Sequence, residues 1–182
     1  MCGIYSIIVP LKDLNKKQFY DNATNKILNQ LNGMNLPADK YKEAVKWTKV
    51  FRAVFLLDEL KQEVFVEKDN PYWDFGYDSA GFCRVASITF SILMDFREWQ
   101  LMAIDKDQWD GKMGHHYLKH LPSGKYFDLT YDQFSVEGLT VPYNLGKPAT
   151  FGLSSKDETM KFSKALGIDL QKVLKEYSKR GK

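Results

Sequence analysis

Three residues of this sequence have side chains that could act together in nucleophilic catalysis: Cys83, His116 and Asp128. A thiol becomes a strong nucleophile when a neighbouring base removes its proton. A histidine that is held in place by a carboxylate is such a base. The elements predicted around these residues would bring the three side chains together.

A predicted β-hairpin places the histidine beside the aspartate. Its turn, Leu-Pro-Ser-Gly at 121–124, suits a type I turn, and its glycine can adopt the left-handed conformation that closes a three-residue loop. In this register Leu118 faces Asp128, and His116 lies diagonally from Asp128 on the same face, roughly 7–8 Å away at the backbone. Since successive strand residues alternate faces, a shift by one residue would give the role to His115.

Cys83 falls at the predicted start of a buried helix. Asp78 or Ser79 can cap this helix, Gly81 allows close backbone approach, and an apolar run without proline follows. A cysteine in the first turn lies at the positive end of the helix macrodipole, which lowers the pKa of its thiol. Its backbone N–H can stabilise an oxyanion.

The hairpin and the helix start resemble the YunG-like family, most of whose members are uncharacterised. Residues 116–124, followed by Asp-Leu-Thr at 128–130 and Gln-Phe at 133–134, are similar to its pattern His-Tyr-Trp-Asn-Arg-Leu-Pro-Asp-Gly, Asp-Leu-Thr and Gln-Phe. The resemblance covers roughly residues 70–135. It implies a papain-like or transglutaminase-like core, in which the helix bearing the nucleophile packs on an antiparallel sheet.

The resemblance assigns the catalytic roles to Cys83, His116 and Asp128. The chain departs from the family at Phe82, where the family tends to have glutamine, and at residues 118–119, where Leu-Lys replaces Trp-Asn. The resemblance therefore implies the three catalytic residues more directly than the oxyanion site. In papain-like enzymes a residue a few positions before the cysteine helps to bind the oxyanion, and Tyr77 is the corresponding candidate here; its structural alternative is packing beneath the helix.

The reaction expected of such a site is attack on an acyl or amide carbonyl of a peptide, a protein or another amide-containing substrate. Water or an amine would then resolve the thioester, giving peptidase, deamidase or transglutaminase-like chemistry. The alternative is a catalytically silent papain-like fold that binds a peptide or a protein. In that case Cys83 is a small buried hydrophobe, His116 a half-exposed strand residue and Asp128 a turn residue.

A second possible nucleophile lies at the N-terminus. Met-Cys-Gly-Ile is how class II glutamine amidotransferases begin, and removal of the methionine would leave Cys2 with a free amine as its base. The other motifs of that family are not evident downstream. The structural alternative is an N-terminal strand that carries an idle cysteine.

The three histidines of the chain do not indicate a metal site. On a strand, His116 and His120 would lie about 13 Å apart, and His115 would point to the opposite face. The sequence also contains neither Cys-x-x-Cys nor His-Glu-x-x-His. We therefore expect neither a metal nor another cofactor.

The length of 182 residues, of which 44% are hydrophobic, predicts one domain over residues 1–182. The predicted helices and the antiparallel sheet make its fold class α+β. Its parts would be a mostly helical segment 1–69, the cysteine helix and catalytic sheet in 70–145, and C-terminal helices in 146–182. Predicted helices span 15–31, 38–60, 155–166 and 169–177, and predicted strands span 63–67, 100–105 and 139–143.

Charge and cysteine usage set expectations about partners and location. The net charge of +3 does not by itself favour nucleic acid, and without a long apolar span no membrane partner is expected. Two cysteines far apart in the chain, with no signal peptide, favour the reducing cytoplasm.

Overall fold

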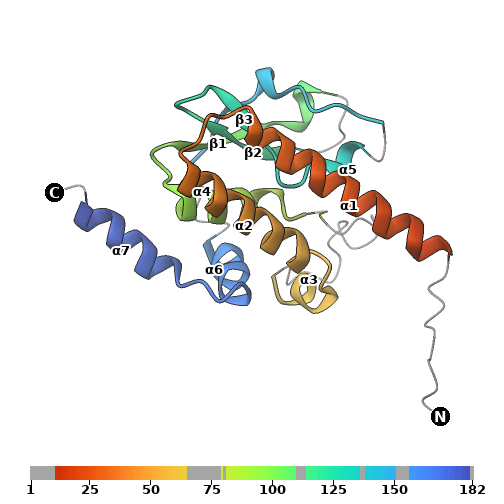
Figure 1. The fold of residues 1–182 in the computed structure, drawn as a ribbon, viewed down its shortest axis with the longest axis horizontal. Helices are drawn as coiled ribbons and strands as arrows, with labels where there is room; N and C mark the ends of the chain where they lie inside the picture. The colour runs from red at the N-terminus through yellow and green to blue at the C-terminus, as the bar shows by residue number, and fades with distance from the viewer. Residues whose placement is uncertain are drawn as a thin grey trace, which may run out of the picture.

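A computed structural model describes residues 11–64, 79, 81–109, 114–135, 138–150 and 156–180. Within these ranges, seven α-helices accompany one antiparallel sheet of four strands (Figure 1). The α+β class predicted from the sequence is therefore confirmed.

The sheet has the strand order β3-β2-β1-β4. Its strands are β1 (Trp99–Ile104), β2 (His115–His120), β3 (Lys125–Phe127) and β4 (Lys147–Pro148). The predicted strand at 100–105 corresponds to β1. The edge strand predicted at 139–143 is wrong, because this stretch leads into a 3-10 helix (Tyr143–Leu145) and the chain pairs with β1 only afterwards, at β4.

The two faces of the sheet pack against different cores. Leu101 and Leu118 are paired across β1 and β2, and both belong to the main core beneath the helices. Their neighbours Met102 and Tyr117 are also paired, but they belong to a smaller core on the opposite face. The alternation of side chains along a strand therefore decides which core each residue of β2 joins.

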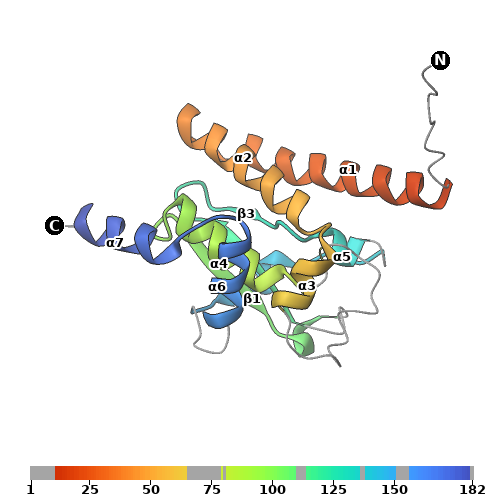
Figure 2. The same cartoon turned by 90° about the horizontal axis from the view of Figure 1, so that it is seen from below.

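The helix that begins at Cys83, α4 (Cys83–Met94), lies in the middle of the molecule (Figures 1 and 2). It packs on β1 and β2 and also contacts the helices α2, α6 and α7. Most of its residues are buried, as the apolar run in the sequence indicates. The other helices are α1 (Leu11–Asn32), α2 (Ala38–Val54), α3 (Asp58–Val64), α5 (Asp132–Ser135), α6 (Lys156–Ala165) and α7 (Leu170–Arg180).

The predicted helix at 38–60 is in fact two helices, α2 and α3, separated by a turn at 55–57. The strand predicted at 63–67 is wrong where the structure describes it, since Glu63 and Val64 end α3; residues 65–67 lie outside the described residues. Val64 is fully buried in the main core, and α3 packs against α6. This tertiary packing outweighs the β propensity of the segment.

An aromatic cluster fixes the start of α4. Phe82, directly before Cys83, is fully buried and stacks on Phe55 of the α2 end at 4.8 Å between ring centroids. It also packs against Phe162 of α6 at 5.6 Å. Phe82, one of the residues at which the chain departs from the YunG-like pattern, is therefore a core residue, which holds the first turn of α4 in place.

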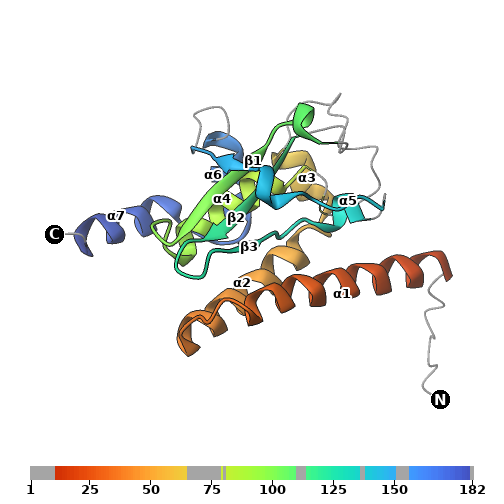
Figure 3. The same ribbon diagram turned by 90° about the horizontal axis from the view of Figure 1, so that it is seen from above.

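The long helix α1 packs against α2 and β3, and one end of it extends beyond the sheet (Figure 3). No helix in the described part of the chain has the length and apolar character needed to cross a membrane.

Candidate active site

The hairpin forms, but its register differs by one residue from the predicted one. Leu118 pairs with Phe127 instead of facing Asp128, and His120 pairs with Lys125. The loop therefore has four residues, 121–124, and is closed by a hydrogen bond from the Gly124 N–H to the His120 carbonyl at 2.8 Å. Gly124 has φ +68°, which confirms the predicted left-handed conformation.

This register places His115, and not His116, beside Asp128. The His115 Nε2 atom lies 2.6 Å from Asp128 Oδ2, and both residues are almost completely buried. The predicted pairing of His116 with Asp128 is wrong. The extra loop residue shifts the pairing of the two strands by one, so that Asp128 lies on the face of the hairpin that carries His115, opposite to the face that carries His116.

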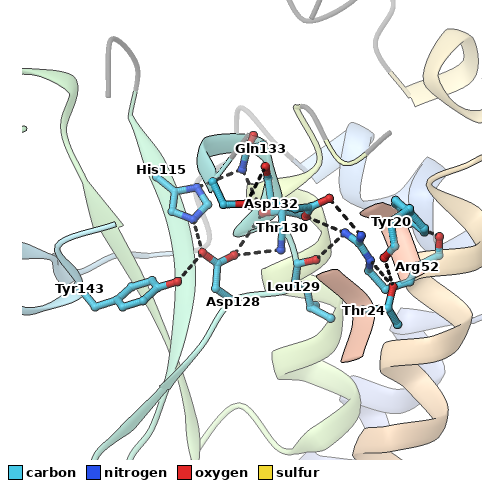
Figure 4. A network of polar contacts seen from close by, with 11 residues as sticks. Tyr20, Thr24, Arg52, His115, Asp128, Leu129, Thr130, Asp132, Gln133 and Tyr143 are labelled. Atoms are coloured by element: carbon cyan, nitrogen blue, oxygen red, sulfur yellow. Dashed lines mark hydrogen bonds and ion pairs between the residues drawn. The ribbon is translucent and has the colours of Figure 1, made fainter. Parts of the chain in front are cut away.

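The Asp128 carboxylate is fully engaged (Figure 4). Its Oδ1 accepts a hydrogen bond from the Thr130 N–H at 2.9 Å, and its Oδ2 accepts one from the Tyr143 hydroxyl at 3.0 Å. Burial and the negative charge of Asp128 raise the pKa of Tyr143, so this hydroxyl keeps its proton and donates it. Because an ionised carboxylate only accepts, the contact with His115 requires an N–H at Nε2.

Cys83 is the first residue of α4 and is half-buried. Burial alone would raise the pKa of its thiol, but hydrogen bonds to His115 and His116 and the positive charges of the two rings outweigh this effect. The pKa of Cys83 is lowered to about 5. The thiol is therefore ionised at neutral pH, as in reactive cysteines.

The pKa of His115 moves in the opposite direction. Burial alone would lower it, but the charge and the hydrogen bond of Asp128, followed by those of Cys83, raise it to about 10. Between these two values a Cys83 thiolate faces a His115 imidazolium. Because each group shifts the pKa of the other, the two protonation steps are properties of the pair.

The start of α4 has backbone N–H groups that the helix itself does not use. Gly81 has φ +79°, and the residue before the helix, Phe82, makes no side-chain capping hydrogen bond. The first four N–H groups of a helix have no partner within the helix, and that of Cys83 is the first of them. Ser79 is buried, but it does not cap the helix; Asp78 and Tyr77 lie outside the described residues.

Gln133 and Thr130 hold the other side of the imidazole ring. The Gln133 Nε2 atom lies 3.2 Å from His115 Nδ1 and 3.1 Å from Thr130 Oγ1. One hydrogen of this amide is donated to Thr130; a second hydrogen bond, to Nδ1, forms only when the ring is neutral, because Nδ1 of the imidazolium carries its own proton. The sequence did not predict the contact of these two residues with the histidine.

A buried ion pair fixes the segment that carries Asp128 and Gln133. Arg52 of α2 binds Asp132 of α5 with two hydrogen bonds of 2.8 and 3.0 Å, and its guanidinium also donates to the Leu129 carbonyl at 3.3 Å (Figure 4). The Arg52 guanidinium lies over the Tyr20 ring of α1 at 3.8 Å. Sequence reasoning missed this pair because Arg52 occupies the apolar stripe of its helix.

Tyr117 and Tyr143 close the face of the sheet around Asp128. The Tyr117 hydroxyl donates to the Tyr143 carbonyl at 2.5 Å, and the two rings pack edge to face. This arrangement depends on Gly146, because a Cβ atom built there would lie 1.8 Å from the Tyr117 hydroxyl. Any larger residue at 146 must displace either the tyrosine or the loop.

We therefore expect Gly146→Ala to move Tyr143 away from Asp128 and to destabilise the fold by about 1–3 kcal/mol, as overpacking typically does. The measurement is urea unfolding followed by tyrosine fluorescence. Gly33→Ala is the matched control, because a Cβ at Gly33 meets only the Lys125 side chain at an ordinary 3.7 Å. Equal stabilities of the two variants would contradict the close approach at Gly146.

The third histidine, His120, lies away from this site. Its ring packs on Trp99 at 4.8 Å between centroids, and its Nδ1 lies 2.8 Å from Ser123 Oγ. In the described ranges no group of three or more His, Cys, Asp or Glu side chains is arranged to hold a metal ion. Cys2 lies outside the described residues.

Comparisons of the chain with protein-family models, with curated proteins and with solved structures give no significant match. The resemblance to the YunG-like family stays a prediction, and the functional argument depends on the geometry of the site.

Proposed function

We propose that the protein is a thiol enzyme with a papain-like or transglutaminase-like core, related to the YunG-like family, that attacks an acyl or amide carbonyl. In this proposal Cys83 is the nucleophile, His115 is its base and Asp128 orients the histidine. The observation that carries it is the buried pair of His115 and Asp128, joined at 2.6 Å, with its ring in contact with a thiol at a helix start.

The two steps of such a reaction fit the surroundings of each group. The Cys83 thiolate attacks the carbonyl carbon, and the negative charge that develops on the carbonyl oxygen meets the N–H groups at the start of α4. Collapse of this intermediate breaks the bond to the leaving group, which takes a proton from an imidazolium beside the sulfur, and leaves a thioester on Cys83. Water or an amine then attacks the thioester and restores the thiol.

A covalent intermediate tests this proposal without knowledge of the natural substrate. p-Nitrophenyl acetate transfers its acetyl group to activated thiolates, and intact-mass and peptide mass spectrometry then locate the modified residue. We expect acetylation of Cys83 at pH 6 to be much faster than that of the same cysteine in unfolded protein, and to disappear in Cys83→Ala.

The chain contains only one other cysteine, which makes Cys2→Ala the matched control. We expect this variant to react at the wild-type rate. Acetylation of Cys2 alone, with survival of glutamine hydrolysis in Cys83→Ala, would favour the amidotransferase alternative. Equal reactivity of folded and unfolded Cys83 would leave only the silent binding module.

A further inference from the structure

Two histidines contact the Cys83 thiol, and their surroundings differ. His115 is fully buried, with Nε2 on Asp128 and Nδ1 beside Gln133. His116 is half-buried, and neighbouring residues of a strand point to opposite faces, so that His116 reaches the thiol from the α4 side of the sheet. Its partner on β1 is Ala103.

The histidine that makes the thiolate is poorly suited to give its proton away. The His115 ring holds its charge through a buried contact with Asp128, and this raises its pKa to about 10. A general acid is most effective when its pKa lies near the working pH. The other imidazole, that of His116, also contacts the thiol but is only half-buried, so solvent can reach its ring.

We propose that His116 is a second catalytic residue of this site, which donates a proton to the leaving group while His115 stays paired with Asp128. This inference deepens the proposed function and rests on it. The proton of the thiol already lies on His115 and stays there while the new bond forms between Cys83 Sγ and the carbonyl carbon and the bond from that carbon to the leaving group breaks. The leaving group departs with the proton of the His116 imidazolium, and neutral His116 can then accept a proton from the attacking water or amine.

This division of roles predicts a dependence on the leaving group. p-Nitrophenolate departs without a proton, whereas the more basic phenolate is expelled more readily when an acid protonates it. General acid catalysis typically contributes a factor of about 10² to 10⁴. Loss of the acid should therefore slow acyl transfer from phenyl acetate much more than from p-nitrophenyl acetate.

The experiment compares the acetylation rates of Cys83 by these two esters at pH 7 in the wild type and in His116→Gln. In His116→Gln we expect the rate with p-nitrophenyl acetate to change by no more than about threefold. The ratio of the p-nitrophenyl acetate rate to the phenyl acetate rate should rise roughly tenfold or more above its wild-type value. His120→Gln is the matched control, because His120 lies on the same face of β2 and contacts Trp99 and Ser123. His116→Asn provides a second variant in case His116→Gln does not fold.

An unchanged ratio in both His116 variants, with wild-type Cys83 acetylated normally, would overturn this inference and leave the proposed function intact. Equal slowing with the two esters would also overturn it, because that result indicates a structural role. Failure of the wild type to be acetylated at Cys83 by either ester would remove both proposals.

Discussion

Replacement of His115 by glutamine is expected to move the pH midpoint of Cys83 alkylation from about 5 toward that of an ordinary thiol, about 8.5. The glutamine amide can still donate to Asp128, so the buried carboxylate keeps a partner while the positive charge beside the sulfur is lost. His116→Gln should produce a smaller shift, because His115 makes the larger contribution to the low pKa of Cys83. The measurement is the rate of iodoacetamide labelling between pH 4 and 10, followed by mass spectrometry.

The size of the effect depends on pH in a way that identifies its cause. At pH 6 the thiolate fraction would fall by a factor of several hundred, but the more basic thiolate is also the better nucleophile, with a Brønsted coefficient of about 0.4–0.5. The labelling rate at pH 6 should therefore fall by only about tenfold. At pH 10 His115→Gln should react faster than the wild type, so the two profiles cross.

A crossing of the profiles separates loss of the ion pair from loss of the fold. A variant that merely unfolds would label like the unfolded chain and would lose its circular dichroism signal. His120→Gln should reproduce the wild-type profile, since His120 does not touch the sulfur. If His116→Gln shifts the midpoint more than His115→Gln, the sequence-based assignment of His116 as the base would be favoured over the one that follows from the structure.

The sequence predicted the type and place of the key elements better than it predicted how they pair. The uninterrupted apolar run after Cys83 is a local signal, and α4 begins at that residue. The left-handed Gly124 is likewise a local requirement of the turn. The register depends on whether the loop closes with three or four residues, and the local sequence is compatible with both lengths. The choice nevertheless decides whether His115 or His116 lies beside Asp128.

Contacts between distant parts of the chain could not be predicted in the same way. Arg52 and Asp132 are far apart in sequence, and an arginine within an apolar stripe is typical of a side chain whose charged end reaches the surface. The segment at 63–64 has strand-like residues, but its packing against α6 makes it helical. In each case a partner that is remote in sequence determines the outcome.

Removal of one partner of the buried ion pair should produce the largest loss of stability. The side chains of Arg52 and Asp132 are only 2% and 4% exposed, so either one left alone is a charge without compensation. We expect Arg52→Met to lower the free energy of unfolding by about 3–5 kcal/mol, out of the 5–15 kcal/mol typical of a domain. Urea unfolding followed by circular dichroism measures this loss. The double variant Arg52→Met/Asp132→Leu should recover much of it, because no unpaired charge remains.

An exposed ion pair in the same chain provides the control. Lys17 and Asp21 lie 2.7 Å apart on α1 with side chains that are 74% and 56% exposed, and Asp21→Ala should change the stability by about 0.5 kcal/mol or less. A comparable loss in Asp21→Ala and Arg52→Met would show that the buried pair contributes no more than a surface pair.

The double variant also tests whether this pair has a role beyond stability. Asp132 begins α5, and the Arg52 guanidinium holds the Leu129 carbonyl within the segment that supplies Asp128, Thr130 and Gln133 to the histidine. An apolar pair can restore the free energy of unfolding by packing in place of the ion pair, but it cannot donate a hydrogen bond to the Leu129 carbonyl. We therefore expect a double variant that is stable yet has a raised midpoint of Cys83 alkylation, since Asp128 then holds His115 less firmly. A wild-type labelling profile in a stable double variant would show that apolar packing alone positions Asp128.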